Sequence, residues 1–158
     1  MNGQGFMKTS SPKLTVPQVS EHEVGTGLRA HRLRRGDGSV CILAIGKLVS
    51  FANQAAVNLA AQGIDVTVWD VRSCAPLDSA MIAEAAAHRI VVTCEDGIRD
   101  GGIGMMIADQ VHEIACGLPV EVLGLPAKFI PQGKPDRILA QLGLDAEGIA
   151  AAVHRRLG

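Results

Sequence analysis

Arg72 is the residue of this sequence whose type and setting best suit the binding of an anion. It follows the apolar run Ile64 to Trp69 and lies between two acidic residues, Asp70 and Asp78. A guanidinium group is always charged, and its planar fork matches a phosphate or a carboxylate with two hydrogen bonds. The alternative role for Arg72 is an ion pair with Asp70 or Asp78 on the surface.

Two further segments carry groups that suit an anionic ligand. The glycine-rich segment Glu95 to Gly104 precedes an apolar helical pattern, and its glycines permit close backbone approach to an anion at the helix start. The alternative is a turn whose glycines serve close packing. A dinucleotide fingerprint fails here, because Ile107 stands where Gly or Ala is required. The segment Leu125 to Asp136 is either a plain surface loop or a donor-rich site with three polar side chains: Lys128, Gln132 and Lys134.

Other catalytic or metal-binding constellations are not indicated. The chain has neither a P-loop motif nor a G-x-S-x-G elbow. The cysteines form no C-x-x-C pair and are expected to be reduced packing residues: Cys41, Cys74, Cys94 and Cys116. The histidines are scattered, and we expect them on the surface or satisfied in the core: His22, His31, His88, His112 and His154. We therefore assign no catalytic residue and no metal ligand in this chain.

The elements that position these segments alternate between strands and helices. The strand signals are short apolar runs, and the helical signals are apolar residues at helical spacing bounded by glycine, proline or capping aspartate. Strands are predicted at 27–35, 40–45, 64–69, 90–94 and 120–123. Helices are predicted between Gly46 and Gly63, after the cap Asp78, along the stripe of Ile103, Met106, Ile107, Val111 and Ile114, from Pro135, and after the cap Asp145.

This alternation predicts an α/β fold with three layers, α/β/α, around a five-stranded, mostly parallel sheet. Only the first strand should run antiparallel. The triplet Gly36-Asp37-Gly38 favours a tight reversal, so the first two strands are expected to be antiparallel neighbours. Ligands of open α/β sheets gather beyond the carboxyl ends of the strands, which is where the Arg72 segment lies.

Length and composition indicate one compact domain in 158 residues, of which 47% are hydrophobic and 20% charged. Residues 1–23 lack periodicity, and we interpret them as a tail or linker that is partly a remnant of the expression vector. Residues 24–158 are interpreted as the domain. A formal net charge of -1 predicts no nucleic-acid or membrane partner. The polar opening Met1 to Lys13 lacks the apolar core of a signal peptide, so we expect a cytoplasmic protein. The basic run is expected to protect an edge strand: Arg29, His31, Arg32, Arg34 and Arg35.

Three stretches resemble a known family: VTVWDVRSCAPLDSAMI, IVVTCEDGIRDGGIG and VLGLPAKFIPQGKPDRILAQLGLDAEGI. They are similar to the carboxyl-terminal domain of the transketolase family, over about residues 24–157. The D-x-R-x-x-x-P-L-D segment is shared widely in that family, including the beta subunits of 2-oxo acid dehydrogenases. The stretch G-L-P-x-x-F-I-P-Q-G is more particular to the 1-deoxy-D-xylulose-5-phosphate synthases, which the chain resembles most.

The resemblance implies a domain of an enzyme that uses thiamine diphosphate and Mg²⁺ and joins a two-carbon unit from pyruvate to glyceraldehyde 3-phosphate, an isoprenoid precursor step. Arg72 then matches the arginine that binds the phosphate of the acceptor. The implied partners are the remaining synthase domains and a second copy in a homodimer. The family's cofactor motif is G-D-G followed by N-N, and this chain has no Asn-Asn pair. We therefore expect no cofactor-binding residue here and no activity from the chain alone.

Two alternatives stay open at this stage. The loop after Glu95 departs from the synthase pattern, with Asp96 in place of a second glutamate and Met105 in place of a serine. The same domain of a transketolase or of a 2-oxo acid dehydrogenase beta subunit is therefore one alternative. A freestanding ligand-binding or scaffold module is the other.

Overall fold

The computed structural model describes residues 28–130 and 132–158, and the tail predicted over residues 1–23 lies outside them. The described residues form one five-stranded sheet in the order β1-β3-β2-β4-β5. The strands are β1 (His31–Arg34), β2 (Val40–Ala44), β3 (Thr67–Asp70), β4 (Ile90–Ile98) and β5 (Val120–Leu125). The helices are α2 (Leu48–Ala60), α3 (Ser79–Ala86), α4 (Ile103–Ile114), α5 (Pro135–Gln141) and α6 (Ala146–Leu157).

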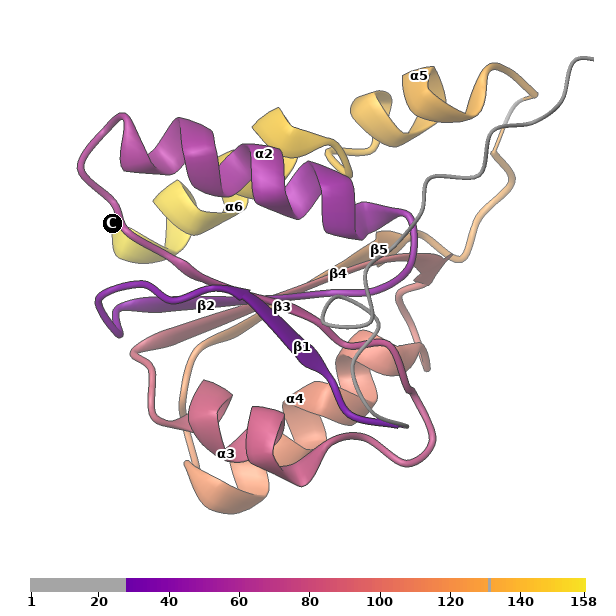
Figure 1. Ribbon diagram of the computed structural model, residues 1–158. Coiled ribbons are helices and arrows are strands. Elements are labelled where there is room, and N and C mark those ends of the chain that lie inside the picture. Colours follow the sequence, from indigo (N-terminus) through magenta and orange to yellow (C-terminus); the bar gives the residue numbers. More distant parts are fainter. Residues whose placement is uncertain (1–27, 131) are drawn as a thin grey trace, which may run out of the picture.

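The sheet is covered on both faces, as the alternating pattern predicts (Figure 1). Helices α2, α5 and α6 pack on one face around a core that includes Leu48, Leu59 and Ile149. Helices α3 and α4 pack on the other face, where Met81 and Ile107 meet the strands. β2, β3, β4 and β5 pair in parallel, and β1 alone is antiparallel. The three-layer α/β/α prediction is therefore confirmed.

The predicted pairing of the first two strands is wrong. β1 pairs antiparallel with β3, and β2 lies between β3 and β4. Both edges of β2 are occupied by parallel partners, so β1 finds its hydrogen bonds on the outer edge of β3. The connection from β1 to β2 passes the start of β3, where the Gly36 amide donates to Thr67 Oγ1 at 3.0 Å and the Asp37 amide to the Asp65 carbonyl at 3.1 Å.

Most helix ends lie where the local chemistry predicts them. Asp78 caps α3 by accepting from the amides of Ala80 and Met81, and Asp145 caps α6 by accepting from the amide of Gly148. Pro135 is the first residue of α5. Each of these signals acts within three residues along the chain, which explains why the sequence reveals them.

The end of β4 and the buried face of α4 both differ from the prediction. β4 continues to Ile98, so the start of the predicted glycine-rich loop is strand. In α4 the buried stripe is narrower than predicted, because Ile107 and Val111 are buried whereas Met106 and Ile114 are 44% and 59% exposed. The 3.6-residue period identifies one face of a helix, but the neighbouring elements determine how wide the buried part of that face is.

Candidate functional site

Arg72 lies just beyond the carboxyl end of β3 in an unusual backbone conformation. Its φ is 59°, which lies in the left-handed region that residues other than glycine, asparagine and aspartate seldom adopt. The Arg72 amide donates to Asp70 Oδ1 at 3.2 Å, and its Nε donates to Asp70 Oδ2 at 3.4 Å. The contacts between Asp70 and Arg72 thus hold the turn that carries the guanidinium. Such backbone strain is concentrated at functional sites in proteins.

The structure brings His31 to the same guanidinium. β1 and β3 are in register with His31 opposite Asp70, two residues before Arg72. The His31 Nδ1 atom lies 3.2 Å from an Arg72 terminal nitrogen. Sequence reasoning missed this neighbour, because it placed β1 beside β2 rather than beside β3. The signal in the sequence is only a histidine in a basic edge strand, and it has no local link to Arg72.

The two acidic residues near Arg72 have different roles. Asp70 pairs with Arg72, as the surface-pair alternative expects, although both side chains are only about a quarter exposed. Asp78 is engaged elsewhere: its Oδ1 caps α3, and its Oδ2 accepts from the Ala30 amide at 3.0 Å. Asp78 therefore ties the start of α3 to the chain entering β1, and Asp70 contacts Arg72.

The glycine-rich segment places an anion from the protein itself at the start of α4. Glu95 is 4% exposed, and its carboxylate accepts from the Gly104 amide at 2.8 Å and from the Ile103 amide at 3.3 Å. A Cβ on Gly102 would overlap the Ile98 carbonyl and the Glu95 carboxylate. A Cβ on Gly104 would overlap Thr93 Oγ1 and the Val122 side chain. The close-packing alternative for these glycines is therefore confirmed, and two first-turn amides of α4 are already occupied by Glu95.

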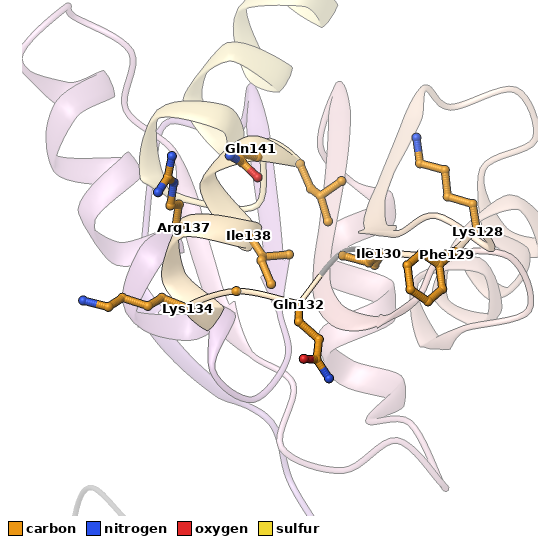
Figure 2. A pocket seen from close by; sticks show the side chains of 10 residues that line it. Lys128, Phe129, Ile130, Gln132, Lys134, Arg137, Ile138 and Gln141 are labelled. Atoms are coloured by element: carbon orange, nitrogen blue, oxygen red, sulfur yellow. The ribbon is translucent and has the colours of Figure 1, made fainter.

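The segment Leu125 to Asp136 borders a broad cavity of about 730 Å³ formed with α5 (Figure 2). Lys128 and Lys134 lie at opposite sides of the view, and the charged end of Lys128 points upward whereas that of Lys134 points to the left. Phe129 is 90% exposed on the same loop. One small anion would therefore not contact both lysines, and the structure favours a surface loop over a convergent donor site.

The triplet Gly36-Asp37-Gly38 does not fit a cofactor site. Asp37 accepts from the Ser39 amide at 2.8 Å and from its hydroxyl at 2.6 Å, and these hydrogen bonds lower the pKa of the Asp37 carboxyl. The triplet lies at the amino end of β3, whereas Arg72 lies at the carboxyl end. Among residues 28–130 and 132–158, no group of three His, Cys, Asp or Glu side chains is placed to hold a metal ion.

The cysteines are free thiols, and two of them are core residues. Burial raises the pKa of Cys94 to about 12 and raises that of Cys41 as well. Cys116 is exposed and Cys74 is half-buried, which differs from the packing role expected for all four. The buried His88 is satisfied, because its ring nitrogens contact the Glu84 carbonyl at 2.8 Å and Thr67 Oγ1 at 3.0 Å.

The basic run lies on and directly beside the edge strand β1, and its charge is partly neutralised. Arg32 pairs with Glu84 at 2.6 Å and stacks over the ring of Trp69 at 5.6 Å, and Arg34 pairs with Asp65 at 2.7 Å. These contacts leave a charged edge that discourages pairing with another strand. Within the described part of the chain, no helix is long and apolar enough to cross a membrane.

The chain is similar to enzymes much longer than itself. It is 41% identical over 109 residues to the 1-deoxy-D-xylulose-5-phosphate synthase of Thermobifida fusca, covering 69% of this chain and 17% of that protein. It is 41% identical over 149 residues to the synthase of an Anaeromyxobacter species, covering 92% of this chain and 23% of that protein. The chain therefore spans less than a quarter of the length of these relatives.

A solved structure and a family match agree with these relatives. The solved structure of a split-gene transketolase, an inactive beta4 tetramer, is similar to this chain with a TM-score of 0.77 and 31% identity, covering 89% of this chain and 46% of that one. The family described as transketolase, C-terminal domain, matches residues 29–149. This match includes every strand of the sheet and the Arg72 turn, and the chain belongs to the transketolase carboxyl-terminal domain family.

Proposed function

We propose that this chain is the carboxyl-terminal domain of a thiamine diphosphate-dependent 1-deoxy-D-xylulose-5-phosphate synthase and that Arg72 binds the phosphate of the acceptor, glyceraldehyde 3-phosphate. The observation that carries the proposal is the Arg72 turn, a strained cationic turn at the carboxyl end of a parallel strand. Relatives that are 41% identical to this chain are synthases. The remaining domains would supply the cofactor and the proton chemistry, since this chain lacks the Asn-Asn pair of the family's cofactor motif.

The proposed role of Arg72 is to bind the acceptor and orient it. The side chain is 23% exposed, so part of it is accessible to a ligand while Asp70 contacts it. A charge-assisted hydrogen bond to phosphate stabilises a complex by about 1.5 to 3 kcal/mol. Because the phosphate does not react, this contact fixes where the aldehyde carbon lies without taking part in bond formation.

The test is Arg72→Ala in the complete synthase that contains this domain, with steady-state kinetics for both substrates. We expect the KM for glyceraldehyde 3-phosphate to rise roughly 10- to 150-fold, which corresponds to the loss of about 1.5 to 3 kcal/mol. Pyruvate decarboxylation should stay near the unmodified rate. Arg89→Ala is the matched control, because Arg89 is exposed at the amino end of β4. Equal losses for donor and acceptor, or no change in either, would refute the phosphate role.

A second candidate is the carboxyl-terminal domain of a transketolase, and the split-gene transketolase at 31% identity favours it. The two candidates differ in the donor, because a synthase releases CO₂ from pyruvate whereas a transketolase moves a two-carbon unit between sugars. Release of CO₂ from labelled pyruvate by the complete enzyme separates them. We also propose that the complete enzyme is a cytoplasmic homodimer, with this domain contacting the remaining synthase domains.

A further inference from the structure

His31 contacts the proposed phosphate-binding arginine from a different strand. It is half-buried on β1, and its Nδ1 lies 3.2 Å from an Arg72 terminal nitrogen. The two residues are 41 positions apart in the chain, so the contact exists only because β1 pairs with β3. Arg72 is therefore held from its own strand by Asp70 and from the edge strand by His31.

The chemistry of the two groups fixes the direction of this hydrogen bond. A guanidinium has five N–H donors and no acceptor, so the Arg72 nitrogen must donate. The Nδ1 atom of His31 must then accept with its lone pair, which leaves the ring proton on Nε2. The contact therefore requires the neutral Nε2–H form of His31.

A neutral acceptor suits this position better than another carboxylate would. Asp70 already provides one negative charge to Arg72. A second carboxylate would compete with the phosphate for the guanidinium, whereas an imidazole lone pair orients the group and leaves its net charge unchanged. Orienting the side chain before the ligand arrives matters, because a free arginine loses about 2 kcal/mol of rotamer entropy when it is fixed.

We propose that His31 is a positioning residue that pre-orients the Arg72 guanidinium for the acceptor phosphate. This inference rests on the proposed function of Arg72. It extends that function to a residue of the edge strand that does not itself touch the ligand. Asn and Leu have nearly the same size, but only Asn has an acceptor where His31 has Nδ1, and the pair His31→Asn and His31→Leu therefore isolates the hydrogen bond.

The experiment uses this chain, with inorganic phosphate as the probe at constant ionic strength, followed by NMR titration of the backbone amide signals of the turn at residues 70–72, which every variant retains. We expect His31→Leu to weaken phosphate binding about 3- to 10-fold, as expected for loss of one hydrogen bond. His31→Asn should bind within about twofold of the unmodified chain. Ring ¹⁵N shifts of the unmodified chain should show the Nε2–H form of His31, and the NMR spectrum of each variant reports whether it is folded.

The outcomes separate this inference from the function on which it rests. If Arg72→Ala abolishes phosphate binding but both His31 variants bind as tightly as the unmodified chain, the positioning role is wrong and the Arg72 role stands. An Nδ1–H form of His31 would likewise overturn the positioning role alone. If Arg72→Ala binds phosphate as well as the unmodified chain does, the proposed function of Arg72 fails, and the inference fails with it.

Discussion

Glu95 is the residue that most clearly changes role between sequence and structure. In the sequence it opens a glycine-rich loop that suits an external anion. In the structure it is buried on β4 and accepts two amide hydrogen bonds from the first turn of α4. A carboxylate at a helix amino terminus also interacts favourably with the helix dipole. Glu95 thus holds strand and helix together, and Gly104 lets them approach closely.

Glu95→Gln should lower the free energy of unfolding by about 1 to 3 kcal/mol, because the amide loses the charge that strengthens both hydrogen bonds and buries an NH₂ group beside backbone donors. Urea denaturation followed by circular dichroism measures the effect. Asp96→Asn is the matched control, since Asp96 is exposed, and it should change the free energy of unfolding by less than about 0.5 kcal/mol. Equal unfolding midpoints for the two variants would contradict the role of Glu95.

At the scale of elements, Asp78 at the start of α3 connects this helix to the edge strand β1. Asp78 caps α3 with one carboxylate oxygen and accepts the Ala30 amide, next to His31, with the other. One side chain therefore fixes both the start of a helix and the entry of the chain into β1. The Asp78 carboxylate therefore joins the start of α3 to the residue that precedes His31.

Asp78→Ala should destabilise the chain by about 1 to 3 kcal/mol, because it removes a helix cap and leaves the half-buried Ala30 amide without this acceptor. Asp78→Asn retains an acceptor oxygen and should lose about half as much or less. Urea denaturation compares the two variants. Hydrogen exchange of the Ala30 amide should accelerate in the alanine variant. Unchanged exchange at that amide would show that the Asp78 contact does not hold β1.

At the scale of the whole molecule, the Arg72 turn lies at the end of the sheet where the parallel strands have their carboxyl ends. The triplet Gly36-Asp37-Gly38 lies near the other end of β3, with the Asp37 carboxylate engaged by Ser39. A domain with this distribution can contribute one contact to a larger site. Within its described residues, no three His, Cys, Asp or Glu side chains are grouped to hold a metal ion.

We therefore predict that this chain alone does not bind thiamine diphosphate at micromolar concentrations in the presence of Mg²⁺. The reason is that the chain lacks the Asn-Asn pair of the family's cofactor motif. Isothermal titration calorimetry measures the binding directly. The complete synthase under the same conditions is the positive control. A dissociation constant in the micromolar range for the isolated chain would contradict the assignment of the cofactor to the other domains.

The sequence by itself determines the features that act locally. The caps at Asp78 and Asp145 and the proline start at Pro135 depend on residues within one helical turn. The apolar runs of the strands determine the layered fold, because strands buried on both faces require helices on each side. Arg72 is found in the same way, since its charge and its place after a strand are both visible in the sequence.

The tertiary structure alone decides how distant segments meet. Only the pairing of β1 with β3 brings His31 to Arg72, and only the close packing of α4 on β4 brings the Glu95 carboxylate to the Gly104 amide. The glycine triplet after β1 favours a reversal but cannot select which strand edge β1 joins. That choice depends on the hydrogen-bonding edges left after β2, β3 and β4 have paired, and a local signal carries no information about those edges.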